Sequence, residues 1–503
     1  MFPIPCAIAI ALLLIGACVE LGFLLNFAYV LLAFGAMAIV PAKFLGGITI
    51  LASAIGFLML SIKVALTPDG MNQMVMACLN SRKLAVLFLF TVIAVAGGFI
   101  LPRVFAGMAQ VFPMNGNGFL TDVGPSGSNF NQSVDVTISF LVACAFFVMA
   151  QSPSFEKQYG VALLWGAGSV IVTGAADMVS PMLHLGPIMD SFRTASYVFM
   201  LDNVVLDARR IIGLMPEASS YGTLAAALGG IIVFCRNAYS PKIKAYVALP
   251  MGLCCLVLAA LSTSSSAYGA LAVILTLIVA DQFYRLVIGN NAQKVVVTRE
   301  LWIGFCVLLL VVCFIAINDN FRNMASRMLD SIVFKKSQTD SYMERTSWTR
   351  AAMGSFYQTF GMGVGIGTAR TSNFFVNIIS STGVIGTAIF CFFLLQFYFA
   401  RLKPRDYVVF ELAHGLKLGS MGILAGLYLC GTVPDYGPLL ASIFGTAVGL
   451  SYRARKNAVL EARASQSATL NDLSPARPIR SARRADRIVG VKAPSNADRS
   501  DLV

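Results

Sequence analysis

Long apolar runs constrain the fold of this chain more than any other feature. Most of them reach about 17 residues, the length at which an α-helix spans the hydrocarbon core of a bilayer, and barrel strands are much shorter. We therefore expect an all-α polytopic integral membrane protein with about 12 or 13 transmembrane helices. The runs lie near 4–19, 22–40, 44–66, 83–101, 135–151, 159–176, 222–236, 243–262, 266–282, 301–317, 373–400, 409–431 and 436–452.

The overall composition excludes a soluble protein. Charged residues make up only 12% of the 503 residues and hydrophobic residues 57%, and the mean hydropathy is +0.77. Soluble globular proteins carry roughly a quarter charged residues, and fewer cannot cover so much apolar surface in water. A soluble enzyme, a fibrous protein and a disordered regulator are all excluded.

The basic residues gather in short segments between the apolar runs. Lys and Arg number 37 against 24 Asp and Glu, a formal net charge of +13. This clustering is typical of the positive-inside rule and argues against nucleic acid binding. If the runs alternate across the bilayer, the basic connections share the cytoplasmic side. The external side then receives three longer segments, near 102–134, 177–221 and 318–372, and we expect function there.

The chain divides into a transmembrane bundle over 1–452 and a tail over 453–503. The tail is rich in Ser, Ala, Pro and Arg and lacks aromatic residues and apolar periodicity, so we expect it to be disordered and cytoplasmic. Its basic residues are suited to anionic lipid headgroups. A regulatory or partner-binding tail is the alternative interpretation.

The 11 cysteines follow no metal-site or disulfide spacing. No carboxylate or histidine cluster at metal spacing is visible either. We therefore expect neither a metal nor a cofactor.

The external segment 318–372 contains seven basic residues against four acidic ones. External loops normally avoid basic residues, so this excess opposes the topological trend. Arginine suits anion binding because its planar fork makes two hydrogen bonds to a phosphate and stays ionised. The segment thus predicts an anion site, and an extramembrane helix with a solvated face is the alternative.

Motif order in this segment resembles that of the O-antigen ligase and O-antigen polymerase superfamily of bacterial envelope enzymes. The family has an Arg-x-x-Trp stretch, a glycine-rich turn and a His-Asn pair opening a helix. The matching residues in this chain are Arg345, Trp348, Gly361, Gly363, Gly365 and Asn373, and Ser372 stands where the ligases have His. Weaker similarities are Arg209-Arg210 with Glu217 and Tyr221 ahead of an apolar helix, and the serine-rich stretch 261–269.

The resemblance implies glycosyl transfer at the outer face of the bacterial inner membrane. A hydroxyl on one lipid-linked repeat unit would attack the anomeric carbon of a glycan on undecaprenyl diphosphate, and the diphosphate would leave. Polymerisation and single ligation stay open, and a flippase and a chain-length regulator are the implied partners. Arginines would stabilise the leaving group without a metal: Arg210, Arg345 and Arg370 first, then Arg209 and Arg350.

The acceptor hydroxyl needs a base, and Ser372 replaces the family's histidine. We expect Glu217 to take this role; a carboxylate that favours the helix N-terminus is the alternative, and His184 is a second candidate. Trp348 and Tyr221 are candidates for stacking on sugar rings, unless they mark the membrane interface. Gly363, Gly365, Ser372 and Asn373 are expected near the substrate, since glycine permits close backbone approach to a ligand or to another helix.

Two other function classes compete with glycosyl transfer. A transporter or flippase for a lipid-linked glycan or another anion would place ionisable residues inside the membrane. In this sequence Asp281 and Glu411 fall near predicted helix ends, so that feature is weak. A structural membrane protein without chemistry is the third class, and the external arginines argue against it.

Overall fold

The computed structural model describes residues 3–40, 49–80, 83–114, 118–195, 204–205, 208–289, 291–317, 326, 340–400 and 406–473. The chain separates into two compact units, Met1–Arg455 and Lys456–Val503. The helical bundle belongs to the first unit.

Every expected apolar run contains a helix. The long helices that match them are α1 (Ile4–Cys18), α2 (Leu21–Val30), α3 (Ala52–Ala65), α5 (Ala85–Val104), α6 (Gly127–Met149), α7 (Phe155–Leu183), α9 (Ala218–Phe234), α11 (Leu249–Leu261), α12 (Ser265–Ile288), α13 (Asn291–Ile317), α16 (Phe374–Phe399), α17 (Tyr407–Cys430) and α18 (Gly437–Leu473). The helices that match no expected run are α4 (Gly70–Leu79), α8 (Gly186–Asp190), α10 (Pro241–Ile243) and α15 (Asp340–Gln358).

Among the described residues, seven helices are long and apolar enough to cross a membrane. They are α5, α6, α7, the continuous stretch Pro241–Leu261, α12, α16 and α17. Helices α3 and α4 pass the same test together but bend by 104° between them, and α1, α2 with its extension to Ala33, and α9 are shorter apolar helices. The protein is therefore an all-α, multi-pass membrane protein, as the apolar runs predict. Where 12 or 13 spanning helices were expected, the described residues contain seven, or eight if the bent pair counts as one span.

The expected helix over 22–40 ends early. After a 3-10 turn over Leu31–Ala33, the chain extends into strand β1 (Ala38–Val40), which pairs antiparallel with β2 (Ile50–Leu51). The backbone N–H of Ala36 donates to the carbonyl of Leu214 at 2.9 Å. The end of this apolar run thus pairs with other segments of the chain instead of continuing the helix.

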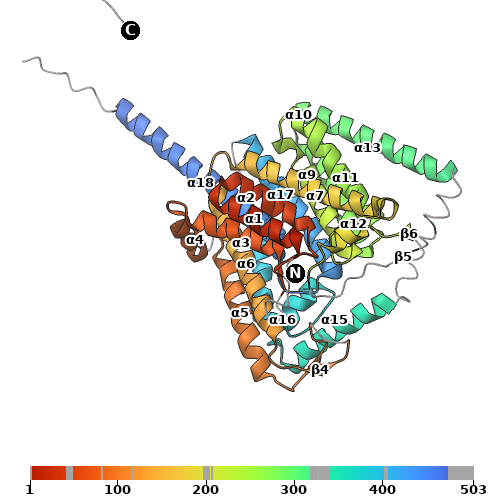
Figure 1. Ribbon diagram of the computed structural model, residues 1–503. Coiled ribbons are helices and arrows are strands. Elements are labelled where there is room, and N and C mark those ends of the chain that lie inside the picture. The colour runs from red at the N-terminus through yellow and green to blue at the C-terminus, as the bar shows by residue number, and fades with distance from the viewer. Residues whose placement is uncertain are drawn as a thin grey trace, which may run out of the picture. The chain divides into compact units, whose positions relative to one another are not determined.

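Small residues set the spacing of the central helices. Helix α9 packs against α7, α11, α12 and α17, and Figure 1 shows these helices grouped together. A Cβ on Gly222 would lie 2.2 Å from the Ser262 hydroxyl oxygen, and one on Gly415 2.7 Å from the Cys235 sulfur. In a bilayer, helix association depends on such close packing because lipid is as apolar as the helix surface.

The bundle has two distinct ends, which we name after the residues that flank α9. At the Glu217 end α9 and α12 begin and α11 and α17 end; at the Arg236 end α9 and α12 end and α17 begins. Lys244 and Arg285 lie at the Arg236 end with Arg236, as the alternation of basic connections predicts. Which side of the bilayer each end faces stays a prediction.

Two of the three long connections are shorter than the sequence predicts. Helix α5 runs to Val104 and α6 begins at Gly127, and a hairpin of β3 (Gln110–Val111) and β4 (Thr121–Asp122) occupies the space between. Helix α7 runs to Leu183 and α9 begins at Ala218, with β5 (Val204–Val205) paired to β6 (Ala208–Arg209). In the third connection, α15 occupies 340–358, and most of 318–339 lies outside the described residues.

The tail differs from the expectation of disorder. Helix α18 continues through 453 to Leu473, so the first part of the tail is helical, and 474–503 lies outside the described residues. The stretch 453–473 is rich in Ala, Arg and Leu, which are strong helix formers and can extend a helix that already exists.

Candidate functional site

An ion pair between Glu217 and Arg345 joins segments that are 128 residues apart. The Arg345 guanidinium Nη2 lies 3.2 Å from Glu217 Oε2, and the two side chains are 29% and 27% exposed. Glu217 immediately precedes α9, and Arg345 lies in the second turn of α15. The structure therefore brings together the predicted base and one of the predicted arginines.

Glu217 is the N-cap residue of α9, but its side chain does not cap the helix. One carboxylate oxygen accepts a hydrogen bond from the Ser219 hydroxyl, and the other contacts Arg345. The backbone of Glu217 is extended, with φ of −154° and ψ of 162°. The side chain is thus directed to the arginine rather than to the orphan N–H groups of the helix.

Arg210 reaches the same site from the loop ahead of α9. Its Nε donates to the carbonyl of Ser262 at 3.3 Å, at the end of α11 and within the serine-rich stretch. Burial lowers the pKa of Arg210, the nearby Glu217 carboxylate raises it, and the charge of Arg345 lowers it. Arg210 therefore interacts electrostatically with both members of the Glu217–Arg345 pair.

Asp177 in α7 holds this loop in place, and its only signal in the sequence is a lone acid directly after the apolar run 159–176. Its Oδ2 accepts from the backbone N–H of Ile212 at 2.7 Å and of Gly213 at 3.0 Å. The side chain is 2% exposed. Two backbone donors to one buried carboxylate fix the path of the chain between Arg210 and Glu217.

Arg370 joins the site from the turn ahead of α16. Its guanidinium carbon lies 3.9 Å from the centre of the Trp348 ring, a cation–π contact. Burial lowers the pKa of Arg370, the charges of Glu344 and Glu217 raise it, and that of Arg345 lowers it. Glu217 thus contacts Arg345 and raises the pKa of Arg210 and Arg370.

The guanidinium groups of Arg210, Arg345 and Arg370 outnumber the carboxylates that act on them, Glu217 and Glu344, and leave an excess of positive charge at one end of the bundle. Burial reduces the screening of such charges by water, and like charges that are close together repel. A multivalent anion such as a phosphate or diphosphate would relieve this repulsion, and the arginine forks match its oxygen atoms. The site can therefore bind an anion.

The glycine-rich turn packs directly against the backbone of neighbouring helices. Gly363 and Gly365 have φ of +83° and +86°, in the left-handed region that strains other residues. A Cβ on Gly363 would lie 2.8 Å from the Ser380 carbonyl oxygen, and one on Gly365 2.7 Å from the Gly97 carbonyl oxygen. Of the two expected roles of these glycines, close approach to a ligand or to another helix, the structure shows the second.

Ser372 and Asn373 lie where the chain enters α16. The Asn373 side-chain oxygen accepts from the backbone N–H groups of Phe375 and Val376, each at 3.1 Å, so it caps the helix. The backbone N–H of Ser372 lies 3.4 Å from the Thr349 hydroxyl oxygen of α15. These contacts join α15 to the start of α16 and fix Arg370 close by.

Three other predicted site residues, Tyr221, His184 and Arg350, are not part of the arginine cluster. Tyr221 is fully buried and its hydroxyl donates to the Val170 carbonyl at 3.0 Å, so its ring packs between helices instead of facing a sugar. His184 ends α7 with φ of 51° and is exposed. Arg350 is exposed on α15, about 140° around the helix from Arg345. The backbone of Arg209 lies in β6, and its side chain is outside the described side chains.

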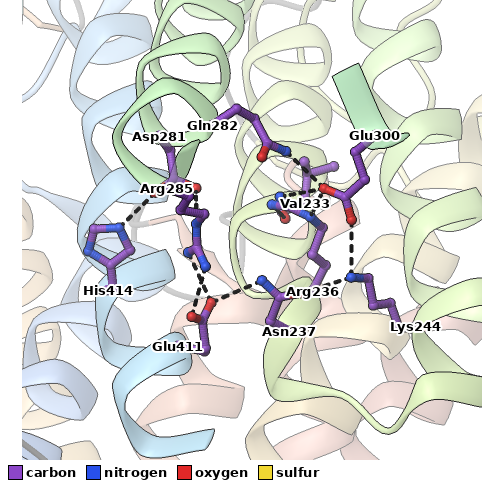
Figure 2. A network of polar contacts seen from close by, with 10 residues as sticks. All are labelled: Val233, Arg236, Asn237, Lys244, Asp281, Gln282, Arg285, Glu300, Glu411 and His414. Carbon is purple, nitrogen blue, oxygen red and sulfur yellow. Dashed lines mark hydrogen bonds and ion pairs between the residues drawn. The ribbon is translucent and has the colours of Figure 1, made fainter. Parts of the chain in front are cut away.

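A second polar network lies at the Arg236 end, and the sequence analysis did not predict it as a unit (Figure 2). Arg285 makes two hydrogen bonds to Glu411, at 2.8 and 2.9 Å, and one to Asp281 at 2.8 Å. His414 Nε2 lies 3.0 Å from the other Asp281 oxygen. The four-residue spacing of Asp281 and Arg285 on one helix was the available signal.

The rest of this network is centred on Glu300. Arg236 and Lys244 contact its two oxygens at 2.9 and 3.2 Å, and Asn237 bridges Lys244 to Glu411. Three cations thus match three carboxylates across α12, α13, α17 and the segment between α9 and α11. Balanced, hydrogen-bonded charges of this kind are the form in which ionisable residues are tolerated inside a membrane protein.

Among the residues that the structure describes, no group of three or more His, Cys, Asp or Glu side chains is placed to hold a metal ion. Comparison of the chain with models of protein families finds no matching family, and comparison with curated proteins finds no match. The arginine cluster around Glu217 is therefore interpreted from its own geometry.

Proposed function

We propose that this chain is a bacterial inner-membrane glycosyltransferase that polymerises or ligates oligosaccharide units carried on undecaprenyl diphosphate. One observation carries the proposal: at one end of a membrane-spanning bundle, Glu217 contacts Arg345 of α15 and interacts electrostatically with Arg210, from the loop ahead of α9, and Arg370, from the turn ahead of α16. The positive-inside pattern of the sequence favours the external side for that end.

The Glu217 carboxylate marks where an anionic ligand would bind. Its contact with Arg345 is a single 3.2 Å hydrogen bond between partly exposed groups. A diphosphate offers more oxygen atoms and more charge than one carboxylate, so it competes well for the guanidinium. Binding of the donor would move Arg345 from Glu217 to the diphosphate, and the carboxylate would then be available to the acceptor.

The reaction needs one bond to form and one to break. The acceptor hydroxyl oxygen forms a bond to the anomeric carbon of the donor glycan, and the bond between that carbon and the diphosphate oxygen breaks. Glu217 takes the hydroxyl proton, and the arginines stabilise the charge that develops on the leaving diphosphate. Trp348 holds the Arg370 guanidinium against its ring and thereby limits the directions in which that cation points.

A direct assay tests this function. Purified protein is incubated with undecaprenyl-diphosphate-linked oligosaccharide, and lipid-linked glycans are separated by length. We expect longer glycans from the unmodified protein, loss of them in Arg345→Ala, and retention in Arg350→Ala, which removes an exposed arginine from the same helix. Equal amounts of product from Arg345→Ala and the unmodified protein would remove the arginine cluster from the chemistry.

The alternative of a transporter or flippase draws on the buried charges of Figure 2, since Asp281 and Glu411 lie within α12 and α17. Both carboxylates are held by Arg285, which favours a role in helix packing over cargo binding. Lipid-linked oligosaccharide that crosses a proteoliposome membrane without growing in length would favour transport instead.

A further inference from the structure

A cavity of about 300 Å³ opens at the Arg236 end of the bundle, away from the Glu217 cluster. It lies between the start of α5, the end of α16, α17 and α18, with Lys83, Lys417 and Arg455 among its walls. None of the described residues that line it is acidic. The cavity is therefore strongly positive.

Lys417 is the buried member of this group. The residue is 8% exposed, and its ammonium donates to the Ala400 carbonyl oxygen at 2.8 Å and lies 5.8 Å from the Phe397 ring centre. An ammonium has three donors, and a neutral carbonyl compensates its charge only in part. A buried cation of this kind is stabilised by an anion that enters the cavity.

Lys83 and Arg455 complete the positive surface. The Lys83 ammonium lies 4.4 Å from the centre of the Tyr452 ring, and Arg455 is exposed at the rim. The neighbouring Arg453 pairs with Glu156. Among the described residues, the cavity's own three cations have no such carboxylate partner, so their charge is available to a ligand.

The remaining walls are apolar and aromatic. Phe393 and Phe397 are 1% and 3% exposed, and Phe399 is 78% exposed next to them at the end of α16. A site for a small soluble anion has no need of an aromatic wall that continues onto the exposed helix surface. A ligand with a phosphate head and an acyl chain fits both parts, since basic pockets between membrane helices bind anionic headgroups.

We propose that this cavity binds an anionic phospholipid of the surrounding leaflet, with the headgroup phosphate at Lys83, Lys417 and Arg455 and an acyl chain along Phe397 and Phe399. The site is independent of the proposed glycosyl transfer, because it lies at the other end of the bundle and shares no residue with the Glu217 cluster.

Native mass spectrometry of the detergent-purified protein tests the site by titration with phosphatidylglycerol and with phosphatidylcholine. The test variant is Lys83→Gln/Arg455→Gln, which leaves the buried Lys417 in place. The matched control is Lys157→Gln/Lys242→Gln, which removes two exposed charges elsewhere. We expect phosphatidylglycerol to bind more tightly than phosphatidylcholine, with about thirtyfold weaker binding in the test variant, since each basic residue contributes about fivefold, and no change in the control.

Lys417→Met provides a second test. It is introduced into the unmodified protein and into the test variant, and it is measured in the one whose melting temperature it leaves unchanged. We expect it to remove the preference for the anionic lipid. Equal affinity for the two lipids, or equal loss in the control and test variants, would overturn the proposal. Displacement of bound phosphatidylglycerol by equimolar glycerol phosphate would also overturn it, because the site would then recognise a soluble anion rather than a lipid.

Discussion

Replacing Glu217 by Gln keeps the size of the side chain and removes the charge that Arg210, Arg345 and Arg370 share. Replacing Arg345 by Gln removes the other partner of the ion pair. The two single variants and the double variant form a double-mutant cycle, which gives the coupling energy between the two residues. Measuring the cycle once for stability and once for reaction rate separates the two contributions of the pair.

The magnitude for stability follows from the geometry of the pair. At 3.2 Å and an effective dielectric constant of about 20, the attraction is about 5 kcal/mol before desolvation. Exposed pairs retain up to about 1 kcal/mol and disrupted buried pairs cost about 3–5 kcal/mol. Since both side chains are a little over a quarter exposed, we expect a coupling energy of about 1–2 kcal/mol.

The magnitude for activity is larger and follows a different rule. Loss of a general base costs about a hundred- to ten-thousandfold in rate, and loss of a charge-assisted contact to the leaving group about a hundred- to thousandfold. Groups that act in the same step are not additive. We therefore expect the double variant to be about as inactive as the worse single variant.

Two measurements on the same purified samples check these values. Denaturant titration in detergent gives the free energy of unfolding, and elongation of undecaprenyl-diphosphate-linked oligosaccharide gives the rate. Glycan elongation by Glu217→Gln at the rate of the unmodified protein, with the expected loss of stability, would refute Glu217 as the base and leave the ion pair a structural role.

The other predictions concern packing and pH. Gly365→Ala should lower the free energy of unfolding by at least about 2 kcal/mol, because φ is +86° and the new Cβ meets backbone; a thermal melt that matches the unmodified protein would contradict this. Arg285→Met should cost about 3–5 kcal/mol by removing the cation that Asp281 and Glu411 share, measured by denaturant titration, whereas Arg285→Lys should cost less. Asp435 lies between α17 and α18, and burial raises its pKa to about 6 from 3.8. The stability that its neutral carboxyl contributes is therefore present at low pH and is lost as pH rises from about 4 to 6. The loss is about 2–3 kcal/mol, and unfolding of Asp435→Asn across that range should lack it.

Much of the architecture was determined by the sequence alone. Apolar runs long enough to cross a bilayer predicted the all-α, multi-pass fold, because every backbone polar group in lipid must be bonded within its own helix. Arg345 and Arg370 were identifiable because basic residues oppose the charge bias expected of an external segment. Local chemistry of this kind needs no knowledge of tertiary contacts.

The roles of individual residues were decided by the tertiary structure. Tyr221 and Asn373 have the chemistry of ligand-binding residues, and only their packing shows that one fills a helix interface and the other caps α16. The contact of Glu217 with Arg345, and the network around Arg285, join residues more than a hundred positions apart. Periodicity and composition report short-range order, whereas a charge pair depends on which helix ends meet in space, and that is fixed only when the whole bundle packs.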